Sequence, residues 1–450
     1  GKNIETDSIS VLATLSKLSY VNIRSNYYLK WCGYLKDCES IRTLYLGNCG
    51  NLSDVYLLKT ILNQCTFYEI DGKYSLDLLD AETQKLDLAG YELTYSNLES
   101  LGDCSKLWKL DISGIKIKDD LGNAISDNDI INEKIVETLA QLKSLKYLNL
   151  ENVKGLYDIS FVKNMNNLRQ INLYGTSVET GLVNDENQKI GLELLNDVST
   201  LKALHIDNDE IDLTAIQMTL NRFTDTRDDN AFSNKLGLHV KDLSIYSQLS
   251  ECSDLVNISM SPDADIFSNM ILDLSGTKLV NYMSYSMRKM PFKAPSTFRK
   301  LSYNDGNATQ INDFSLVTQM DTISLYNAYG SSSQLVNVFS SFASLDSLNS
   351  LTVDRWYIDD LSIFAVLNDI SLTSLTFSNA GNVAKCVRFS SISGLENLKE
   401  LKSLSVSYNL ELSDLSGFAN LDSLESVKIT RCSKLSNIAG IEFLSKLKAL

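Results

Sequence analysis

The C-terminal stretch 398–450 repeats itself with a period of 23 residues. It consists of LKELKSLSVSYNLELSDLSGFAN (398–420), then LDSLESVKITRCSKLSNIAGIEF (421–443), then LSKLKAL (444–450). The same shift aligns Leu401 with Leu424, and Asn409 with Cys432. A unit this short cannot bury its apolar face alone, so the period predicts a solenoid in which neighbouring units share one continuous core.

Each unit carries the pattern L-x-x-L-x-L-x-x-N/C-x-L, which resembles the leucine-rich repeat family. We call the first leucine of the pattern position p. An apolar residue at p−3 in many units makes the repeats similar to those of bacterial internalin-type surface proteins. Weaker copies of the pattern extend along the whole chain. The seventeen candidate p positions are Leu18, Ile41, Leu62, Thr83, Leu107, Leu145, Leu168, Leu201, Val240, Asn269, Phe298, Met320, Leu348, Leu372, Leu401, Leu424 and Leu447.

The resemblance implies an α/β leucine-rich-repeat solenoid, with a curved parallel β-sheet on the concave face and short helices and loops on the convex face. We expect residues 1–17 to form an N-terminal cap with a helix from about Asp7, followed by a first strand at 20–24. Residues 18–450 then form about 17 repeats. The last repeat stops at Leu450 within its strand, and Gly1 is typical of a cleaved expression tag. We therefore expect the natural protein to continue beyond this chain.

Three intervals between p positions are longer than the rest, and each contains apolar residues at helical spacing. These segments are residues 129–142, 188–196 and 212–223. Asp129 is placed to cap the first of them. We expect three additional helices on the convex side, where insertions into a repeat are tolerated.

Register places five of the eight cysteines in the core, at p−3, p+3 or p+8. No C-x-x-C pair points to zinc, and reduced thiols do not identify a compartment. The five are Cys38, Cys49, Cys65, Cys104 and Cys432, while Cys32, Cys252 and Cys386 have no predicted place.

The charge balance excludes some partners. Lys plus Arg number 41 and Asp plus Glu 56, so the net charge of −15 disfavours nucleic acid or an anionic membrane as the main partner, although it also serves solubility. No apolar run approaches the roughly 20 residues of a membrane span, so this segment should not insert into a membrane directly, and the chain starts without a signal peptide.

Motifs for catalysis or cofactor binding are absent from the sequence, which has no phosphate-binding loop and no nucleophile elbow. The acidic string from Asp207 to Asp212 lacks the glycine and the closing glutamate of a calcium loop. We therefore expect no cofactor, no metal and no enzymatic activity.

The concave face offers a surface that the core does not require, because p+2, p+4 and p+6 point away from it. Tyrosines and acids predominate there in the N-terminal and central units, and serines and threonines from Met320 onwards. Hydroxyls are common on a solvated sheet, whereas tyrosine suits recognition. His205 and Asp207 on one strand face could also form a metal or acid–base pair, or lie on a solvated surface. Our candidate contact residues are Tyr147, Tyr174, His205, Asp207 and Tyr246.

Residues 282–300 (YMSYSMRKMPFKAPSTFRK) form a basic, aromatic and Met-rich stretch in an acidic chain. They are either a protruding loop that contacts a partner or an irregular spacer whose apolar side chains fill the core. The candidate partner-loop residues are Arg288, Lys289, Phe292 and Lys293.

The sequence therefore predicts a non-catalytic binding module. By its resemblance to internalin-like proteins, it would belong to a bacterial cell-surface or secreted protein that holds a protein or glycan on the concave face. One alternative is an intracellular scaffold or secreted effector, whose repeats present a substrate to a catalytic domain outside this chain. Another is a carbohydrate-cleaving enzyme that uses paired carboxylates. The sequence names neither the ligand nor the oligomeric state nor the organism.

Overall fold

A computed structural model gives the fold of the protein, and it describes most of the chain between residues 6 and 450. The described residues are 6–26, 29, 32–47, 49, 61, 65, 67–69, 79, 81, 83–207, 210–225, 228–232, 236–241, 243–260, 271–284, 292–304, 319–326, 332–356, 358–378 and 388–450.

The chain forms two compact units. The first comprises Gly1–Thr219 and Arg227–Asn234, and the second comprises Leu220–Thr226 and Lys235–Leu450. The chain therefore leaves the first unit, returns to it for one short segment, and then continues in the second unit.

The first unit begins with a 3-10 helix, η1 (Thr6–Thr14), where a helix was expected from about Asp7. A three-stranded parallel sheet follows, in the order β1-β2-β3. Its strands are β1 (Tyr20–Asn22), β2 (Thr43–Tyr45) and β3 (Phe67–Glu69), with η2 (Gly33–Asp37) between the first two.

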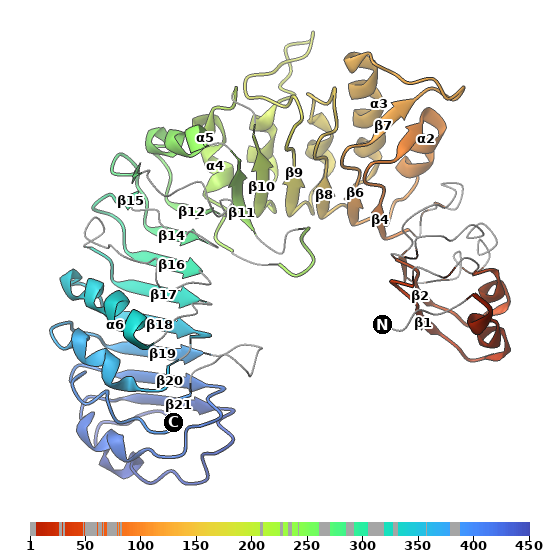
Figure 1. Ribbon diagram of the computed structural model, residues 1–450. Helices are drawn as coiled ribbons and strands as arrows, with labels where there is room; N and C mark the ends of the chain where they lie inside the picture. The colour runs from red at the N-terminus through yellow and green to blue at the C-terminus, as the bar shows by residue number, and fades with distance from the viewer. Residues whose placement is uncertain are drawn as a thin grey trace. The chain divides into compact units, whose positions relative to one another are not determined.

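The remaining strands of the first unit are parallel neighbours in the order β4-β6-β8-β9-β10, one per repeat (Figure 1). They are β4 (Lys85–Asp87), β6 (Lys109–Asp111), β8 (Tyr147–Asn149), β9 (Gln170–Asn172) and β10 (Ala203–Ile206). A small second sheet pairs β5 (Glu92–Thr94) with β7 (Lys116–Lys118). In the five main strands, the residues paired across the sheet are the p+2 residues of successive repeats, so the predicted register is confirmed here.

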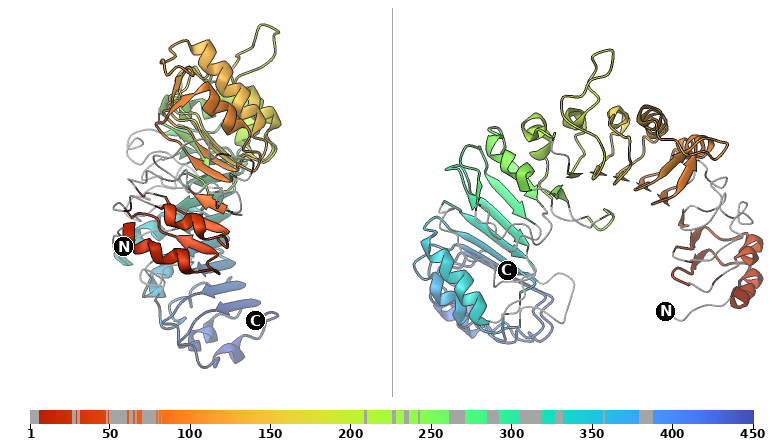
Figure 2. Two further views of the ribbon diagram at one scale, coloured as in Figure 1. Left: turned by 90° about the vertical axis from the view of Figure 1, so that its right-hand side faces the viewer. Right: turned by 45° about the horizontal axis from the view of Figure 1, so that its top comes forward.

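Helices lie on the other side of these strands (Figure 2). They are α2 (Tyr95–Gly102), α3 (Asn128–Gln141), η5 (Ser160–Asn164), η6 (Leu192–Asp197), η7 (Leu213–Ile216) and α4 (Gln217–Leu220). All three additional helices expected in the long repeats are present, as α3, as η6, and as η7 with α4. Asp127 rather than Asp129 caps α3, because its carboxylate accepts hydrogen bonds from the amides of Asp129 and Ile130.

The second unit continues the same parallel arrangement in the order β11-β12-β14-β16-β17-β18-β19-β20-β21. These strands are β11 (Gly237–Val240), β12 (Asn257–Met260), β14 (Asn281–Ser284), β16 (Lys300–Asn304), β17 (Thr322–Tyr326), β18 (Ser350–Asp354), β19 (Ser374–Ser378), β20 (Ser403–Ser407) and β21 (Ser426–Thr430). The short strands β13 (Leu272–Asp273) and β15 (Phe292–Lys293) pair separately. The helices are α5 (Leu243–Ser247), η8 (Gln248–Glu251), α6 (Ser332–Ser340), η10 (Ser341–Ser344), η11 (Leu361–Leu367), η12 (Ser416–Asn420) and η13 (Ile441–Phe443).

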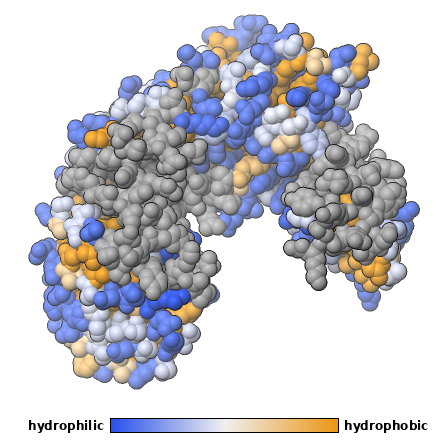
Figure 3. All heavy atoms as spheres, in the orientation of Figure 1, coloured by the Kyte–Doolittle hydropathy of each residue, from blue (hydrophilic) through white to orange (hydrophobic). Residues whose placement is uncertain are grey.

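The leucines of the repeat form the core in both units. In the repeat that starts at Leu401, this residue and Leu404 and Val406 are all 0–1% exposed. Alternate residues of the same strand point to the other face and remain partly exposed, as the burial pattern of β20 shows. Burial of each leucine contributes about 1.5–3 kcal/mol. Figure 3 accordingly shows a mainly hydrophilic outer surface on the last repeats, with only scattered apolar patches.

The fold is therefore a leucine-rich-repeat solenoid of parallel strands and short helices, as the sequence predicts, but three p positions are wrong. β3 pairs Phe67 with Thr43, which makes Cys65 equivalent to Ile41. The repeat thus starts at Cys65, and the predicted start, Leu62, lies outside the described residues. The error arose because a cysteine holds the position that the pattern assigns to leucine.

The other two errors lie in the second unit. Val240 ends β11 instead of preceding a strand. β12 and β14 each begin two residues after a fully buried leucine, Leu255 and Leu279 respectively. The predicted start at Asn269 lies outside the described residues. A helical pattern at residues 243–251 separates β11 from the next strand, which displaced the predicted register.

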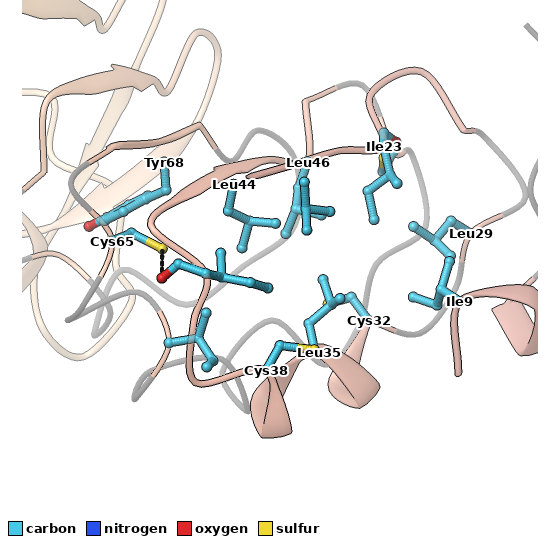
Figure 4. Close-up of a cluster of buried hydrophobic side chains, with 14 residues drawn as sticks. Ile9, Ile23, Leu29, Cys32, Leu35, Cys38, Leu44, Leu46, Cys65 and Tyr68 are labelled. Carbon is cyan, nitrogen blue, oxygen red and sulfur yellow. Dashed lines mark hydrogen bonds between the residues drawn. The ribbon is translucent and has the colours of Figure 1, made fainter. Parts of the chain in front are cut away.

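Four of the five cysteines predicted for the core are buried, and the fifth, Cys432, is only half-buried. Cys32, Cys38, Cys49, Cys65, Cys104 and Cys252 are buried free thiols, Cys432 is half-buried, and Cys386 lies outside the described residues. Figure 4 shows three of them among the apolar side chains of the N-terminal repeats, with the Cys65 thiol directed at the Ile41 carbonyl, 3.9 Å away. Cys252, which had no predicted place, lies three residues before Leu255 and is therefore at p−3 of the corrected repeat.

Candidate binding surface

The strand face is defined here as the side of the strands opposite the helices, to which the sequence assigns the p+2, p+4 and p+6 residues. The sequence predicts that Tyr147, Tyr174 and His205 are exposed on it. That prediction is wrong, because these side chains are only 3%, 7% and 6% exposed. All three belong to the first unit, in which a separate segment contacts Tyr147 and the neighbouring Gln170.

The contacting element is the segment 228–232 (Asp-Asp-Asn-Ala-Phe), which we call the docked segment. Its Asp228 carboxylate accepts a hydrogen bond of 2.6 Å from the Tyr147 hydroxyl and lies 3.2 Å from Nε of Arg169. The Asp228 side chain is only 12% exposed. These partners lie on β8 and just before β9, so one carboxylate ties the segment to two adjacent repeats.

Main-chain atoms of the docked segment are bound as well. Lys109 Nζ donates a hydrogen bond of 2.7 Å to the Asn230 carbonyl oxygen and lies 4.5 Å from the centre of the Phe232 ring. The Phe232 amide donates a hydrogen bond of 2.9 Å to Gln170 Oε1. Three strands of the sheet thus contribute side chains that bind Asp228, Asn230 and Phe232 of the segment.

Two further residues orient Gln170, which is completely buried. Its Oε1 accepts from Phe232, so its amide nitrogen is the atom that lies 3.0 Å from Nε2 of His205. An amide nitrogen only donates, so Nε2 of His205 is the acceptor. Tyr174 packs edge-on against the imidazole, with the ring centroids 5.4 Å apart. His205 and Tyr174 therefore position a residue that binds the segment.

Charges on this surface reflect burial and mutual contact. Burial and the hydrogen bond to Asp228 raise the pKa of Tyr147 well above its usual value. Burial and the neighbouring Lys85 lower the pKa of Lys109. Burial alone would raise the pKa of Asp228, but the hydrogen bonds from Tyr147 and Asn230 and the Arg169 charge hold it below its ordinary value. The carboxylate therefore stays ionised where it is bound.

Cations stacked on aromatic rings continue this surface toward the N-terminal repeats. Lys85 Nζ lies 4.7 Å from the Trp108 ring centre, and the Arg24 guanidinium lies 4.2 Å from that of Tyr45. Burial and the charge of Arg24 lower the pKa of Lys85. The sequence prediction considered tyrosines and acids on this face and therefore missed the cations. Lys85 and Lys109, at p+2 of two successive repeats, were the signal that could have revealed them.

Most of the acids on the strand face have structural roles. Asp87 and Asp111 end their strands and accept hydrogen bonds from the backbone amide two residues later, and Asn149 does the same. Asn149 also donates a hydrogen bond of 2.9 Å to Asp111. Asp207, a predicted contact residue, accepts a 2.7 Å hydrogen bond from the Gly175 amide. The described residues contain no group of three or more side chains suited to holding a metal ion.

Tyr246, the fifth predicted contact residue, belongs to the second unit and is also placed wrongly by the sequence. It lies in α5 rather than on a strand and is 0% exposed. Its hydroxyl donates a 3.1 Å hydrogen bond to the Leu238 carbonyl oxygen. Helical spacing of apolar side chains buries it, so Tyr246 is a core residue.

The structure describes only part of the predicted partner loop. Arg288 and Lys289 lie outside the described residues, and for Phe292 only the backbone, in β15, is described. Lys293 is exposed, with Nζ 3.4 Å from Asp273.

The strand face of the second unit carries hydroxyls and amides. From β17 to β21, half-exposed serines and threonines lie in register, as in Thr352, Thr376 and Ser405. Closer to β12, a cavity of about 170 Å³ opens on this face. It is lined by Phe223, Thr224, Asn257, Ile258, Asn281, Lys300 and Ser302.

Comparison with known proteins finds solved structures that are similar to this chain. An internalin (inlF) from Listeria monocytogenes matches 99% of this chain and 93% of its own at 13% identity, with a TM-score of 0.24. A leucine-rich-repeat protein from Leptospira interrogans matches 99% and 98% at 13% identity, with a TM-score of 0.33. TLR13, in a complex with ssRNA13, matches 92% of this chain and 62% of its own at 15% identity, with a TM-score of 0.29. No protein-family model and no curated protein matches the sequence. Within the described part of the chain, no helix is both long and apolar enough to span a membrane.

Proposed function

We propose that this leucine-rich-repeat protein is a non-catalytic module that binds a protein or glycan partner through its strand face, as part of a bacterial cell-surface or secreted protein. One observation carries the proposal. The strand face of the first unit already binds a peptide, the docked segment, with side chains from three adjacent strands.

The chemistry of the strand face also supports binding rather than catalysis. Repeat cores need only the leucines that point toward the helices, so the side chains on the other face are free to vary. Here they include cations stacked on aromatic rings, such as Lys85 on Trp108. Aromatic and cationic side chains are enriched where proteins recognise partners. Among our predicted contact residues, Tyr147, Tyr174, His205 and Asp207 keep a place in this proposal as residues on or beneath the recognition surface.

A binding screen with substitutions on opposite sides of the repeats tests the proposal. The full chain is immobilised and probed with an array of printed glycans and with a set of purified extracellular domains. Each partner found is then measured against Trp108→Ala in the first unit and Thr376→Arg in the second, both on the strand face. Glu133→Arg, an exposed position on α3, is the control on the helix side.

We expect at least one strand-face variant to weaken binding tenfold or more, because central aromatic contacts at interfaces contribute about 2 kcal/mol or more. Glu133→Arg should bind as the unmodified chain does. A partner that binds both strand-face variants at full strength, and is lost with Glu133→Arg, would show that the helix side is the recognition surface.

A further inference from the structure

The docked segment is bound as proteins bind foreign peptides. It reaches partners that lie 62, 81 and 121 residues away in the sequence. Two of the hydrogen bonds described above join the strands to main-chain atoms of the segment, the Asn230 carbonyl and the Phe232 amide, and therefore depend little on sequence. A third involves the Asp228 carboxylate, which does depend on sequence. Such a combination of backbone capture and one charged anchor is common in peptide recognition.

The strand side of this contact is pre-organised. Gln170 is held by His205, and His205 in turn packs against Tyr174. These contacts are made between side chains of the strands and do not involve the docked segment, so little side-chain entropy remains to be lost when a peptide binds. Like charges also gather here, because Lys85 repels Lys109 of the next repeat and Arg24 repels Lys85. An acidic ligand relieves that repulsion.

The aromatic end of the segment, Phe232, is recognised by a separate contact with Lys109. Lys109 Nζ lies 4.5 Å from the centre of the Phe232 ring and 6.0 Å from that of Tyr147. One ammonium group therefore contacts both the bound ring and a ring of the sheet while it also donates to the Asn230 carbonyl. The site therefore recognises two features of its ligand, an acidic residue and an aromatic residue four positions later.

We propose that the docked segment is an internal ligand, occupying a site on the strand face of the first unit that binds an acidic peptide with an aromatic residue four positions after the acid. A partner presenting such a segment displaces residues 228–232 and takes over their contacts with Tyr147, Arg169, Gln170 and Lys109. The inference rests on the proposed function and goes further, since it names the partner as a protein with an acidic and aromatic segment. The internal ligand also sets a threshold, because a partner must bind more tightly than the docked segment does.

The test uses the full chain and the labelled peptide acetyl-Asp-Asp-Asn-Ala-Phe-amide, with binding followed by fluorescence anisotropy. In the unmodified chain the docked segment competes, so binding should be weak. Asp228→Asn removes the charged anchor of the internal ligand but leaves the strand side intact. Because hydrogen bonds to charged groups are among the stronger ones in proteins, we expect the peptide to bind this variant at least about tenfold more tightly than the unmodified chain.

Two controls separate recognition from a general charge effect. Asp229→Asn removes the same charge from an exposed neighbour and should bind the peptide as weakly as the unmodified chain does. A second peptide with asparagine in place of its first aspartate should bind the Asp228→Asn chain at least tenfold more weakly. Adding Tyr147→Phe to Asp228→Asn should also weaken binding of the first peptide, because this removes the hydroxyl that would donate a hydrogen bond to the peptide's carboxylate.

The proposal is overturned if Asp228→Asn binds the peptide no more tightly than the unmodified chain, or if both peptides bind it equally. Hydrogen exchange, measured on the same samples, shows from the amides of the repeat strands that each variant is folded, and from the Phe232 amide whether its segment is docked. Failure of the proposed function would give a different result. The peptide would bind Asp228→Asn as expected, but the partners found in the screen would bind every strand-face variant as tightly as the unmodified chain.

Discussion

Tyr147→Phe isolates one hydrogen bond that holds the docked segment. The substitution removes only the hydroxyl that donates to Asp228 at 2.6 Å. The chain supplies a matched control in Tyr157→Phe, because the Tyr157 hydroxyl donates to Asp129 at 2.9 Å in an exposed setting. The same chemical change is therefore made to one tyrosine–aspartate pair that is largely buried and to another that is solvated.

The expected magnitudes differ for a physical reason. A hydrogen bond to a charged acceptor contributes about 1.5–3 kcal/mol when water cannot replace the donor. Asp228 keeps the Arg169 contact at 3.2 Å, so we place the loss at the lower end, about 1.5–2 kcal/mol. At Tyr157, water takes the place of the hydroxyl, and the loss should be about 0–1 kcal/mol, as for other exposed polar pairs.

Hydrogen exchange at the Phe232 amide measures the difference, because this amide is bonded to Gln170 Oε1 only while the segment is docked. With 1.4 kcal/mol for each factor of ten, Tyr147→Phe should lower its protection by about 10–30-fold. Tyr157→Phe should leave the protection within about threefold of its original value, since Tyr157 does not touch the segment. Equal effects of the two substitutions, or no effect of Tyr147→Phe in a folded chain, would refute the reasoning.

Three further predictions concern stability and thiol chemistry. Asn409→Ala should destabilise the second unit by about 2–4 kcal/mol in urea unfolding, because the buried side-chain amide donates to the Phe389 carbonyl and accepts from the Glu411 amide. Cys432→Ala, at the equivalent position of the next repeat, should cost under about 1 kcal/mol. Burial raises the pKa of Cys65 to about 11, so its thiol should resist alkylation at pH 8. The stability that the neutral thiol contributes is present below about pH 9 and is lost as the pH rises through 11. Rapid labelling of this cysteine in the folded chain, mapped by mass spectrometry, would contradict the prediction. Tyr246→Ala should lower the stability of the second unit by about 3–5 kcal/mol, as large-to-small changes in cores do. A change in unfolding free energy close to zero would instead indicate that Tyr246 is a surface residue.

Prediction from the sequence succeeded where a repeat carries its full pattern and failed where one position departs from it. The p+2 residues from Lys300 to Ser426 pair across the second unit as expected. Cys65 occupies a p position that leucine fills elsewhere, so the pattern misplaced that repeat by three residues. Tyr246 was assigned to a strand because the register was carried forward across an insertion, although the surrounding residues have helical spacing.

The candidate surface shows a different limit. Alternation along a strand correctly separated the core positions from those on the strand face, as in β20. It could not show that Tyr147 and His205 are buried, because Tyr147 is bonded to a segment outside the repeat pattern and His205 packs against side chains of the neighbouring repeat. It also gave no role to Gln170, a completely buried residue whose Oε1 accepts a hydrogen bond from the Phe232 amide.

The sequence by itself therefore determined the repeat, the parallel sheet and the apolar core. Each of these follows from the spacing of leucines within one unit and from the contact of that unit with the next. The tertiary structure alone decided which part of the strand face is open and which is occupied. Contacts such as that between Lys109 and Asn230 join residues 121 positions apart, and no local pattern encodes such a pairing. It forms only when the folded sheet presents side chains from several repeats to one returning segment.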